Sequence, residues 1–376
     1  METREQKVTT VGRHSYARAV LLQNLLQAEG IDCFLAHENL IQPDISGGVE
    51  LKVNAPDIER AMKIIESAFP ATAGSKRVKK ALSFKRILVP VDFSDQSLAA
   101  CKLAIGLAAG SKADIRLLHV YYNPIIEATP FDLSYSYQLN LSKYLHEIEG
   151  EARMNLDRLV SDLKKYLEAK KITEVKIGNA LMNGLAADEI LSYSNKFKPG
   201  IIVMGTKGIG QKASGSMGSV TASIIERSDF TVFAIPPNCK LSGMSDLKSI
   251  LFATDFDPAD ELAIEKLIHL VSPLGMKIYC YHISVGIKKP WERVKMDDLK
   301  EHFGREFPNA NIDFGIVMSD NLMNGLETFL RNKPIDALAV TTHKRGVFAN
   351  FFAPSVTRRI FTDIPRPLLV FRADGD

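Results

Sequence analysis

This chain repeats itself at the scale of a whole domain. The stretch FKRILVPVDFSDQSLAACKLAI recurs later as LKSILFATDFDPADELAIEKLI, so Asp92 of the first copy matches Asp255 of the second. His119 and His282 also occupy matching places, and we expect a buried, hydrogen-bonded histidine at each. A repeat this long predicts tandem domains rather than a solenoid of short units.

Two further matches follow in the same order. The pentapeptide LMNGL occurs at 181–185 and again at 322–326. Near the end of each copy, GSVTASII from Gly218 corresponds to PSVTRRIF from Pro354. These ordered matches indicate that the chain arose by duplication of a domain, and we interpret both copies as the same fold.

Each copy alternates short apolar strands with helices. The apolar runs of the first copy predict strands at 87–91, 115–120, 175–180, 201–205 and 231–235. Those of the second copy predict strands near 250–254, 277–282, 312–317, 337–341 and 367–371. Ser94 and Asp257 are expected to cap the first helix of each copy. The pattern predicts two α/β domains, each a doubly wound, five-stranded parallel sheet covered on both faces.

The order β-α-β-β-α in residues 8–69 predicts a small α+β unit ahead of the repeats. A segment with Pro, Gly, Ser and several lysines then reads as a linker. We therefore divide the chain into a small domain at 1–69, a linker at 70–83, and repeats at 84–238 and 247–376.

Composition narrows the possible partners. Lys and Arg total 47 against 44 Asp and Glu, so the net charge of +3 gives no reason to expect nucleic acid as a partner. The sequence has no apolar run long enough to span a bilayer and no secretory segment. The 4 cysteines fit no metal-ligand spacing. We expect a cytoplasmic protein with reduced cysteines and no membrane partner.

A glycine-rich segment follows the fourth strand of the first copy. Gly205, Gly208 and Gly218 are spaced as G-x2-G-x9-G, and Ser219 comes next. Glycines let a phosphate chain approach backbone N–H groups, and a helix that begins near Gly218 turns its positive end toward an anion. Side chains that would add a charge or a hydroxyl are Lys207, Ser219 and Thr221. The alternative is a surface loop that binds nothing.

Asp92 directly follows the first strand of the first copy. In a doubly wound sheet, ligands bind beyond the carboxyl ends of the strands, where the winding reverses. Asp92 could there accept hydrogen bonds from an adenine amino group or a ribose hydroxyl. The alternative is that its carboxylate only orders the turn into the next helix.

The stretches ILVPVDFSDQS and DIRLLHV, followed by the glycine motif and VTASII, resemble the universal stress protein family in order and spacing. The resemblance covers about 84–238, and again 247–372. It implies a fold like that of the adenine nucleotide alpha hydrolases and a regulatory role in the stress response. The glycine motif is typical of the ATP-binding branch of the family.

This resemblance assigns a nucleotide site to the first copy. Val91 would contact adenine through its backbone, Asp92 would contact the nucleoside, and Val120 would line the base pocket. The glycines and Ser219 would hold the phosphates. The full predicted site is Pro90, Val91, Asp92, Val120, Met204, Gly205, Lys207, Gly208, Gly218, Ser219, Val220 and Thr221. The expected ligand is ATP, with or without Mg²⁺, and no catalytic or metal-ligand set is expected.

The second copy departs from the glycine motif. Aligning its VT dipeptide with that of the first copy places Thr341, Lys344 and Pro354 where the three glycines stand. Proline removes a backbone N–H, and the other two replacements add bulk. We predict that the second copy binds no ATP and serves as a structural partner that pairs with the first. A homodimer of whole chains is also expected from the family.

The small N-terminal unit carries a second resemblance. SYARAVLLQNLLQAEGIDCFLAHEN and GGVELKVNAPDIERAMKII look like a family of small prokaryotic signal-transducing domains. No catalytic residue set comes with that family.

Three classes of function remain open. The first is an ATP-binding regulator of stress signalling that acts on a protein partner of unknown identity. The second is a slow ATP hydrolase or phosphotransferase, which would also need groups that hold a metal and position water. The sequence shows no Walker A motif and no base near Ser219. The third is an interaction scaffold without a ligand.

Overall fold

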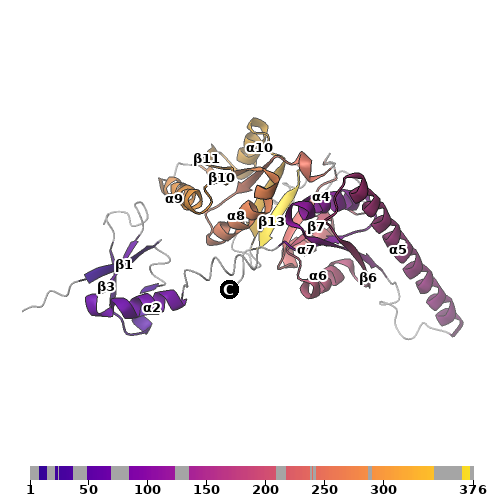
Figure 1. The fold of residues 1–376 in the computed structure, drawn as a ribbon, viewed down its shortest axis with the longest axis horizontal. Coiled ribbons are helices and arrows are strands. Elements are labelled where there is room, and N and C mark those ends of the chain that lie inside the picture. Colours follow the sequence, from indigo (N-terminus) through magenta and orange to yellow (C-terminus); the bar gives the residue numbers. More distant parts are fainter. Residues whose placement is uncertain are drawn as a thin grey trace, which may run out of the picture. The chain divides into compact units, whose positions relative to one another are not determined.

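A computed structural model gives the fold of the chain (Figure 1). It describes residues 8–14, 22–23, 25–36, 49–68, 84–122, 135–208, 217–237, 239, 243–286, 290–342 and 366–372. The chain divides into a small unit that contains the N-terminal sheet and a large unit that contains both repeats except residues 288–298. The linker predicted at 70–83 lies outside the described residues.

The small unit is an antiparallel sheet packed against a helix. Strands β1 (Val8–His14), β3 (Val49–Asn54) and β2 (Cys33–Ala36) lie in the order β1-β3-β2. A short 3-10 turn (Ala55–Asp57) leads into α2 (Ile58–Ala68). The core contains the apolar side chains of Leu22, Leu26, Ile31, Cys33, Leu51, Val53 and Ala61. Of the helix expected before β2, the described residues 22–23 and 25–28 are helical.

Both repeats of the large unit have the predicted sheet. The strands of the first repeat are β4 (Arg86–Pro90), β5 (Asp114–Tyr121), β6 (Ile177–Asn183), β7 (Ile201–Gly205) and β8 (Thr231–Ile235). Those of the second are β9 (Ser249–Ala253), β10 (Lys277–Val285), β11 (Ile312–Ser319), β12 (Ala337–Thr342) and β13 (Leu368–Arg372). Neighbouring strands within each repeat are parallel. In each repeat the third, second, first, fourth and fifth strands lie side by side in that order, which is doubly wound.

The two sheets join edge to edge. Strand β13 pairs antiparallel with β8, with Leu369 opposite Phe233 and Val370 opposite Val232. The result is a single 10-stranded sheet in the order β11-β10-β9-β12-β13-β8-β7-β4-β5-β6.

Helices cover both faces of this sheet (Figure 1). They are α4 (Asp95–Ser111), α5 (Tyr135–Ala169), α6 (Ala186–Phe197), α7 (Ser219–Arg227), α8 (Pro258–Val271), α9 (Pro290–Glu306) and α10 (Leu322–Asn332), with 3-10 turns η4 (Met244–Asp246) and η5 (Ser272–Leu274). One apolar core contains side chains of α4, α5, α8 and α9, and the other contains side chains of α6, α7 and α10. Strand residues alternate between the two, since Ile87 and Val89 enter the first core and Leu88 the second.

The helix starts predicted from the sequence are confirmed. Ser94 caps α4 by accepting a hydrogen bond from Ser97 N, and Asp257 caps α8 by accepting one from Ala259 N. Each bond satisfies a backbone donor that the first helical turn leaves without a partner. All the cysteines are free thiols. Within the described residues, no helix combines the length and the apolar character that crossing a bilayer requires.

One sequence match proves to be coincidental. In the first repeat, LMNGL ends strand β6 and enters a turn at Gly184, whose φ is +148°. In the second repeat all of LMNGL lies in helix α10. Strand register explains the discrepancy, because His119 pairs with Leu181 whereas the equivalent His282 pairs with Ile316. Ile316 is therefore the counterpart of Leu181, and the duplication stands on the other matches.

Candidate functional site

A cavity opens in the first repeat beyond the carboxyl ends of β4 and β7, the two neighbouring strands between which the winding reverses. It offers about 680 Å³ of empty space, counting its open mouth. Its lining consists of Pro90, Val91, Asp92, Ser97, Leu118, Val120, Ala186, Ile190, Met204, Gly205, Thr206, Lys207, Gly208, Gly218, Ser219, Val220 and Thr221. Every residue that the sequence predicted for the site is in this set.

A histidine fixes the turn that follows β4. His119 Nδ1 lies 2.7 Å from the carbonyl oxygen of Val91, and its ring centroid lies 4.4 Å from that of Phe93. Phe93 has a φ of +65°, which few residues with a side chain adopt. The imidazole thus stabilises the turn that carries Asp92 to the cavity. The hydrogen bond expected of His119 is confirmed, but its side chain is half-buried rather than buried.

Asp92 orders this turn while it lines the cavity. Its Oδ1 accepts hydrogen bonds from Ser94 N at 3.1 Å and from Ser94 Oγ at 2.6 Å. The carboxylate is therefore held in place before any ligand arrives. The structural role that the sequence left open is present, and the position on the cavity wall is compatible with the binding role as well.

The first two glycines of the motif avoid different neighbours. A Cβ on Gly208 would lie 2.6 Å from Asp92 Oδ2, inside the cavity wall. A Cβ on Gly205 would lie 2.8 Å from Gln96 Cβ, in helix α4. Gly208 therefore keeps the space beside Asp92 open. Gly205 instead permits close packing of helix and strand, a reason that differs from the phosphate contact expected from the sequence.

Helix α7 points its amino end at the cavity. The third glycine of the motif, Gly218, precedes the helix and donates its backbone N–H to Thr206 O at 2.7 Å, so that N–H is already used. The N–H groups of Ser219 and the next two residues belong to the first turn, where no intrahelical acceptor exists. Thr221 lines the cavity, and its buried hydroxyl donates to Gly205 O at 2.8 Å, so this donor already has a partner within the protein.

The lining divides into an apolar part and a polar part. Leu118, Val120, Ile190 and Met204 supply apolar side chains suited to the flat face of a base. The charged side chains on the cavity wall are Asp92 and a largely buried Lys207. Residues 209–216, between Gly208 and the α7 end, lie outside the described residues.

The sequence prediction missed some of the lining. The additional residues are Ser97, Leu118, Ala186, Ile190 and Thr206. Strand alternation could have found Leu118, which is two positions before Val120 and so faces the same side of β5. Ala186 and Ile190 lie on α6, whose packing against the sheet cannot be seen from neighbouring residues in the sequence.

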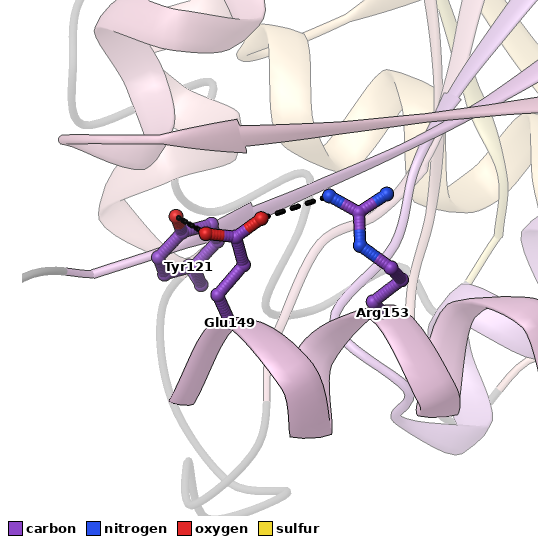
Figure 2. A network of polar contacts seen from close by, with 3 residues as sticks. All are labelled: Tyr121, Glu149 and Arg153. Atoms are coloured by element: carbon purple, nitrogen blue, oxygen red, sulfur yellow. Dashed lines mark hydrogen bonds and ion pairs between the residues drawn. The ribbon is translucent and has the colours of Figure 1, made fainter. Parts of the chain in front are cut away.

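A polar network lies beside the site, at the end of β5 (Figure 2). The Tyr121 hydroxyl donates to Glu149 Oε2 at 3.4 Å, and Arg153 donates to Glu149 Oε1 at 2.8 Å. Burial and the Glu149 carboxylate raise the pKa of Tyr121, and the hydrogen bond from Arg153 lowers the pKa of Glu149. The phenol therefore stays neutral, and the network links α5 to the strand that lines the cavity.

The second repeat has the same turn. His282 Nδ1 lies 2.8 Å from the carbonyl oxygen of Thr254, and Phe256 has a φ of +64° with its ring centroid 4.5 Å from the His282 ring. Asp255 occupies the place of Asp92 in this turn. The predicted buried, hydrogen-bonded His282 is confirmed.

The side chains around this second turn differ from those of the first. Ile250 is the counterpart of Ile87, and the residues paired with them are Ala337 and Ile201, respectively. Counting four residues onward from each of these partners places Thr341 where the first repeat has Gly205. The same comparison places Asp260 at Ser97 and Tyr281 at Leu118. The other replacements of the motif, Lys344 and Pro354, lie outside the described residues.

Asp260 is a buried carboxyl group with 2% of its surface exposed. It accepts hydrogen bonds from Thr254 Oγ1 at 2.7 Å and from Asp255 N at 3.2 Å. Burial raises the pKa of Asp260 to about 7, and the carboxylates of Asp255 and Asp257 contribute in the same direction. Burial also raises the pKa of Asp255. Where the first repeat has the small hydroxyl of Ser97, the second repeat thus has a carboxyl group that becomes negatively charged above neutral pH.

Two family models match this chain. The model described as "Universal stress protein family" matches residues 83–236. The model described as "Putative prokaryotic signal transducing protein" matches residues 11–68. The matches fall on the first repeat and on the small unit, two of the three regions for which the sequence had shown these resemblances.

Individual relatives agree with this assignment. Universal stress protein MJ0531 of Methanocaldococcus jannaschii is 30% identical over 155 residues, which are 40% of this chain and 82% of that protein. Universal stress protein YxiE of Bacillus subtilis is 25% identical over 153 residues, 40% of this chain and 99% of that protein. A crystal structure of a universal stress protein from Archaeoglobus fulgidus superposes with a TM-score of 0.59 at 16% identity and covers 77% of this chain and 98% of its own. That breadth of coverage shows that the fold extends well beyond the first repeat.

Proposed function

Because this chain belongs to the universal stress protein family, we propose that its first repeat binds one ATP and that the protein acts as a nucleotide-dependent regulator. Adenine would lie against the apolar side chains that include Val120 and Met204, and Asp92 would contact the nucleoside. The triphosphate would lie along Gly208 toward the amino end of α7, where Ser219 begins the helix.

One observation supports this proposal above the others. Residues from strands β4, β5 and β7 and from helix α7, far apart in sequence, converge on one cavity at the winding reversal. That edge is where open α/β sheets bind ligands, and a helix amino end favours an anion. An apolar wall, a fixed carboxylate, a cationic Lys207 and this helix end suit an adenine nucleotide better than an uncharged ligand.

We propose that the second repeat binds no ATP and acts as the structural partner of the first. The sequence places Lys344 and Pro354 where the first repeat has Gly208 and Gly218, and above pH 7 Asp260 would place a negative charge where the first repeat has Ser97. Like charges brought together in a buried site cost several kcal/mol. Pairing of whole chains into a homodimer, and a location in the cytoplasm, are further parts of the same proposal.

A slow hydrolase is the second candidate, and the protein's own residues give it less support. Phosphoryl transfer needs groups that hold a metal ion and orient water. Among the described residues, no group of three His, Cys, Asp or Glu side chains is arranged to hold a metal. Turnover of ATP above the uncatalysed background that is lost in Asp92→Ala would favour the hydrolase.

Calorimetry with a matched glycine pair tests the proposal. Wild-type protein should bind one ATP per chain, and Gly208→Val should abolish binding because the new side chain meets Asp92. Gly150→Ala is the control, because a Cβ at Gly150 in helix α5 meets no atom within 4 Å. Absence of binding to the wild type at millimolar ATP, a free energy weaker than about −4 kcal/mol, would refute the proposal. Equal binding by Gly208→Val would show that the cavity is not the site.

A further inference from the structure

An arginine of the second repeat reaches into the first. Arg372, at the end of β13, has 6% of its surface exposed. Its Nε donates to Ser228 O at 2.7 Å, and its Nη2 donates to Glu226 O at 2.6 Å and to Ile225 O at 3.3 Å. Two nitrogens of a buried guanidinium, Nε and Nη2, thus donate to three backbone carbonyls of the other repeat.

These carbonyls close the carboxyl end of helix α7, which ends at Arg227. The last carbonyls of a helix have no intrahelical partner, and that end carries partial negative charge. The planar guanidinium presents several N–H groups in a fixed fork, so one side chain can serve several acceptors. Arg372 is therefore a cap for this helix, supplied from outside the repeat.

Helix α7 is the helix whose amino end lines the nucleotide cavity. That end is attached to β7 and the residue after it, through Thr221 Oγ1 to Gly205 O and through Gly218 N to Thr206 O. The helix has 9 residues and a rise of about 1.5 Å per residue, so its two ends lie only about 13 Å apart. A short, hydrogen-bonded rod held at both ends transmits a displacement of one end to the other.

The antiparallel junction explains why Arg372 arrives there. Because Val370 lies opposite Val232, β13 continues past the beginning of β8, where the chain emerges from α7. In the first repeat the position that corresponds to Arg372 is Pro236. The pair Thr341–Phe371 corresponds to the pair Gly205–Ile235, and Arg372 and Pro236 each come one residue later. Proline offers no side-chain donor, so this contact runs in one direction, from the second repeat to the first.

We propose that Arg372 is a positioning residue through which the second repeat holds the phosphate-binding end of α7 in place. The inference rests on the proposed function, because it concerns the same nucleotide site. The proposed base and nucleoside contacts come from β4, β5 and β7, whereas the hydrogen bonds of Arg372 described above go to the end of α7 and to Ser228. Loss of this clamp should therefore weaken binding of the phosphates and spare binding of the nucleoside.

The test compares ATP with adenosine, which lacks phosphates, by calorimetry on the full chain. Arg372→Met keeps the length of the side chain and removes its donors. We expect ATP affinity to fall roughly 3- to 30-fold, the range of mutations that alter coupling between sites. Adenosine affinity should change less than about twofold, and Arg372→Lys should lie between the wild type and Arg372→Met because it keeps the charge without the fork. Arg331→Gln is the control, because Arg331 forms an exposed ion pair with Glu327 elsewhere in the same repeat.

Each outcome separates this inference from the proposed function. If the wild type fails to bind ATP, the proposed function falls, and the inference falls with it. If the wild type binds and Arg372→Met weakens ATP and adenosine equally, Arg372 only maintains the fold. Unchanged ATP affinity in Arg372→Met would also overturn the inference. Should Arg372→Met fail to fold, the ratio of ATP to adenosine affinity in Arg372→Lys decides the question.

Discussion

The two repeats have the same turn after their first strand and different side chains around it. In both, a histidine ring bonds the carbonyl that precedes an aspartate, and the next phenylalanine adopts a positive φ. Beside that turn the first repeat has Ser97 and Gly205, and the second has Asp260 and Thr341. The backbone frame has therefore persisted after duplication, while the groups that would meet a ligand have changed.

Because both repeats keep this turn, we attribute it to the fold and not to a ligand. A residue with a side chain at φ +64° is strained, and the second repeat retains Phe256 there although its phosphate motif is lost. Asp92 and Asp255 should therefore both be read first as parts of the turn. The residues that indicate ligand binding are those around the two aspartates, above all Ser97 and Gly208 in the first repeat.

Transferring the second repeat's carboxyl group to the first should have the largest effect. Ser97→Asp places a negative charge on the wall of the proposed ATP cavity, where a like-charge contact costs several kcal/mol. We expect ATP affinity to fall more than about a hundredfold at pH 8. Calorimetry at pH 8 measures this, and the loss should be smaller at pH 5.5 if the new carboxyl group becomes protonated.

Ser97→Asn is the matched control for that experiment, since it has nearly the same size without the charge. Its ATP affinity should lie much closer to that of the wild type. If ATP affinity fell equally in Ser97→Asp and Ser97→Asn, the size of the side chain, and not its charge, would account for the expected difference in ATP binding between the two repeats.

The reverse change should stabilise the second repeat. Because the pKa of Asp260 is about 7 in the folded protein and far lower in an unfolded chain, the folded state binds more protons between these values. Stability should therefore fall as pH rises from about 4 to 7. Asp260→Asn should remove this decline and raise the free energy of unfolding at pH 7.5 by roughly 2–3 kcal/mol.

Urea unfolding of the wild type and Asp260→Asn at several pH values measures this effect. The two proteins should be close in stability near pH 4.5 and diverge toward neutral pH. Parallel curves across that range would show that Asp260 carries no unusual proton affinity. Asp255, whose pKa is also raised, would be expected to shift with its neighbour.

Removing the helix caps should change the free energy of unfolding by a smaller amount, and by different amounts in the two repeats. Ser94→Ala removes a cap from α4 and should cost about 1 kcal/mol. Asp257→Ala removes the cap of α8, but it also removes a charge that raises the pKa of Asp255 and Asp260. Its net cost at pH 7.5 should therefore be below that of Ser94→Ala in the same urea experiment. A larger cost for Asp257→Ala would contradict the like-charge account.

The smallest effect should come from a surface ion pair. Arg331 and Glu327 lie 3.3 Å apart on α10, and the Arg331 side chain is 78% exposed. Arg331→Gln should change the free energy of unfolding by less than about 0.5 kcal/mol, because exposed pairs are well screened. A loss above 1 kcal/mol would show that α10 depends on this pair and would disqualify the variant as a control for Arg372→Met.

The sequence was sufficient for the fold and for the set of residues that line the candidate cavity. Apolar runs and caps such as Ser94 and Asp257 depend on neighbouring residues alone, so a single sequence reveals them. The cavity also follows from a general rule of doubly wound sheets, and every predicted site residue lies on its wall.

What the sequence could not supply depends on contacts between distant residues. LMNGL carries no information on its own about whether it ends a strand or enters a helix, because the surrounding packing decides this. The partner of the Thr221 hydroxyl and the neighbour of Gly205 likewise become visible only when α7 and α4 are packed against β7. Arg372 is the extreme case, because its acceptors are more than 140 residues away in the chain.

The edge-to-edge joint between β8 and β13 has one more consequence. Separate subunits that pair through an edge strand come apart when they are diluted, whereas strands of one chain meet at an effective concentration set by the covalent connection. The contact between the two halves is therefore independent of how much of the protein a cell makes. At low protein concentration, the first repeat would therefore still be paired with the second.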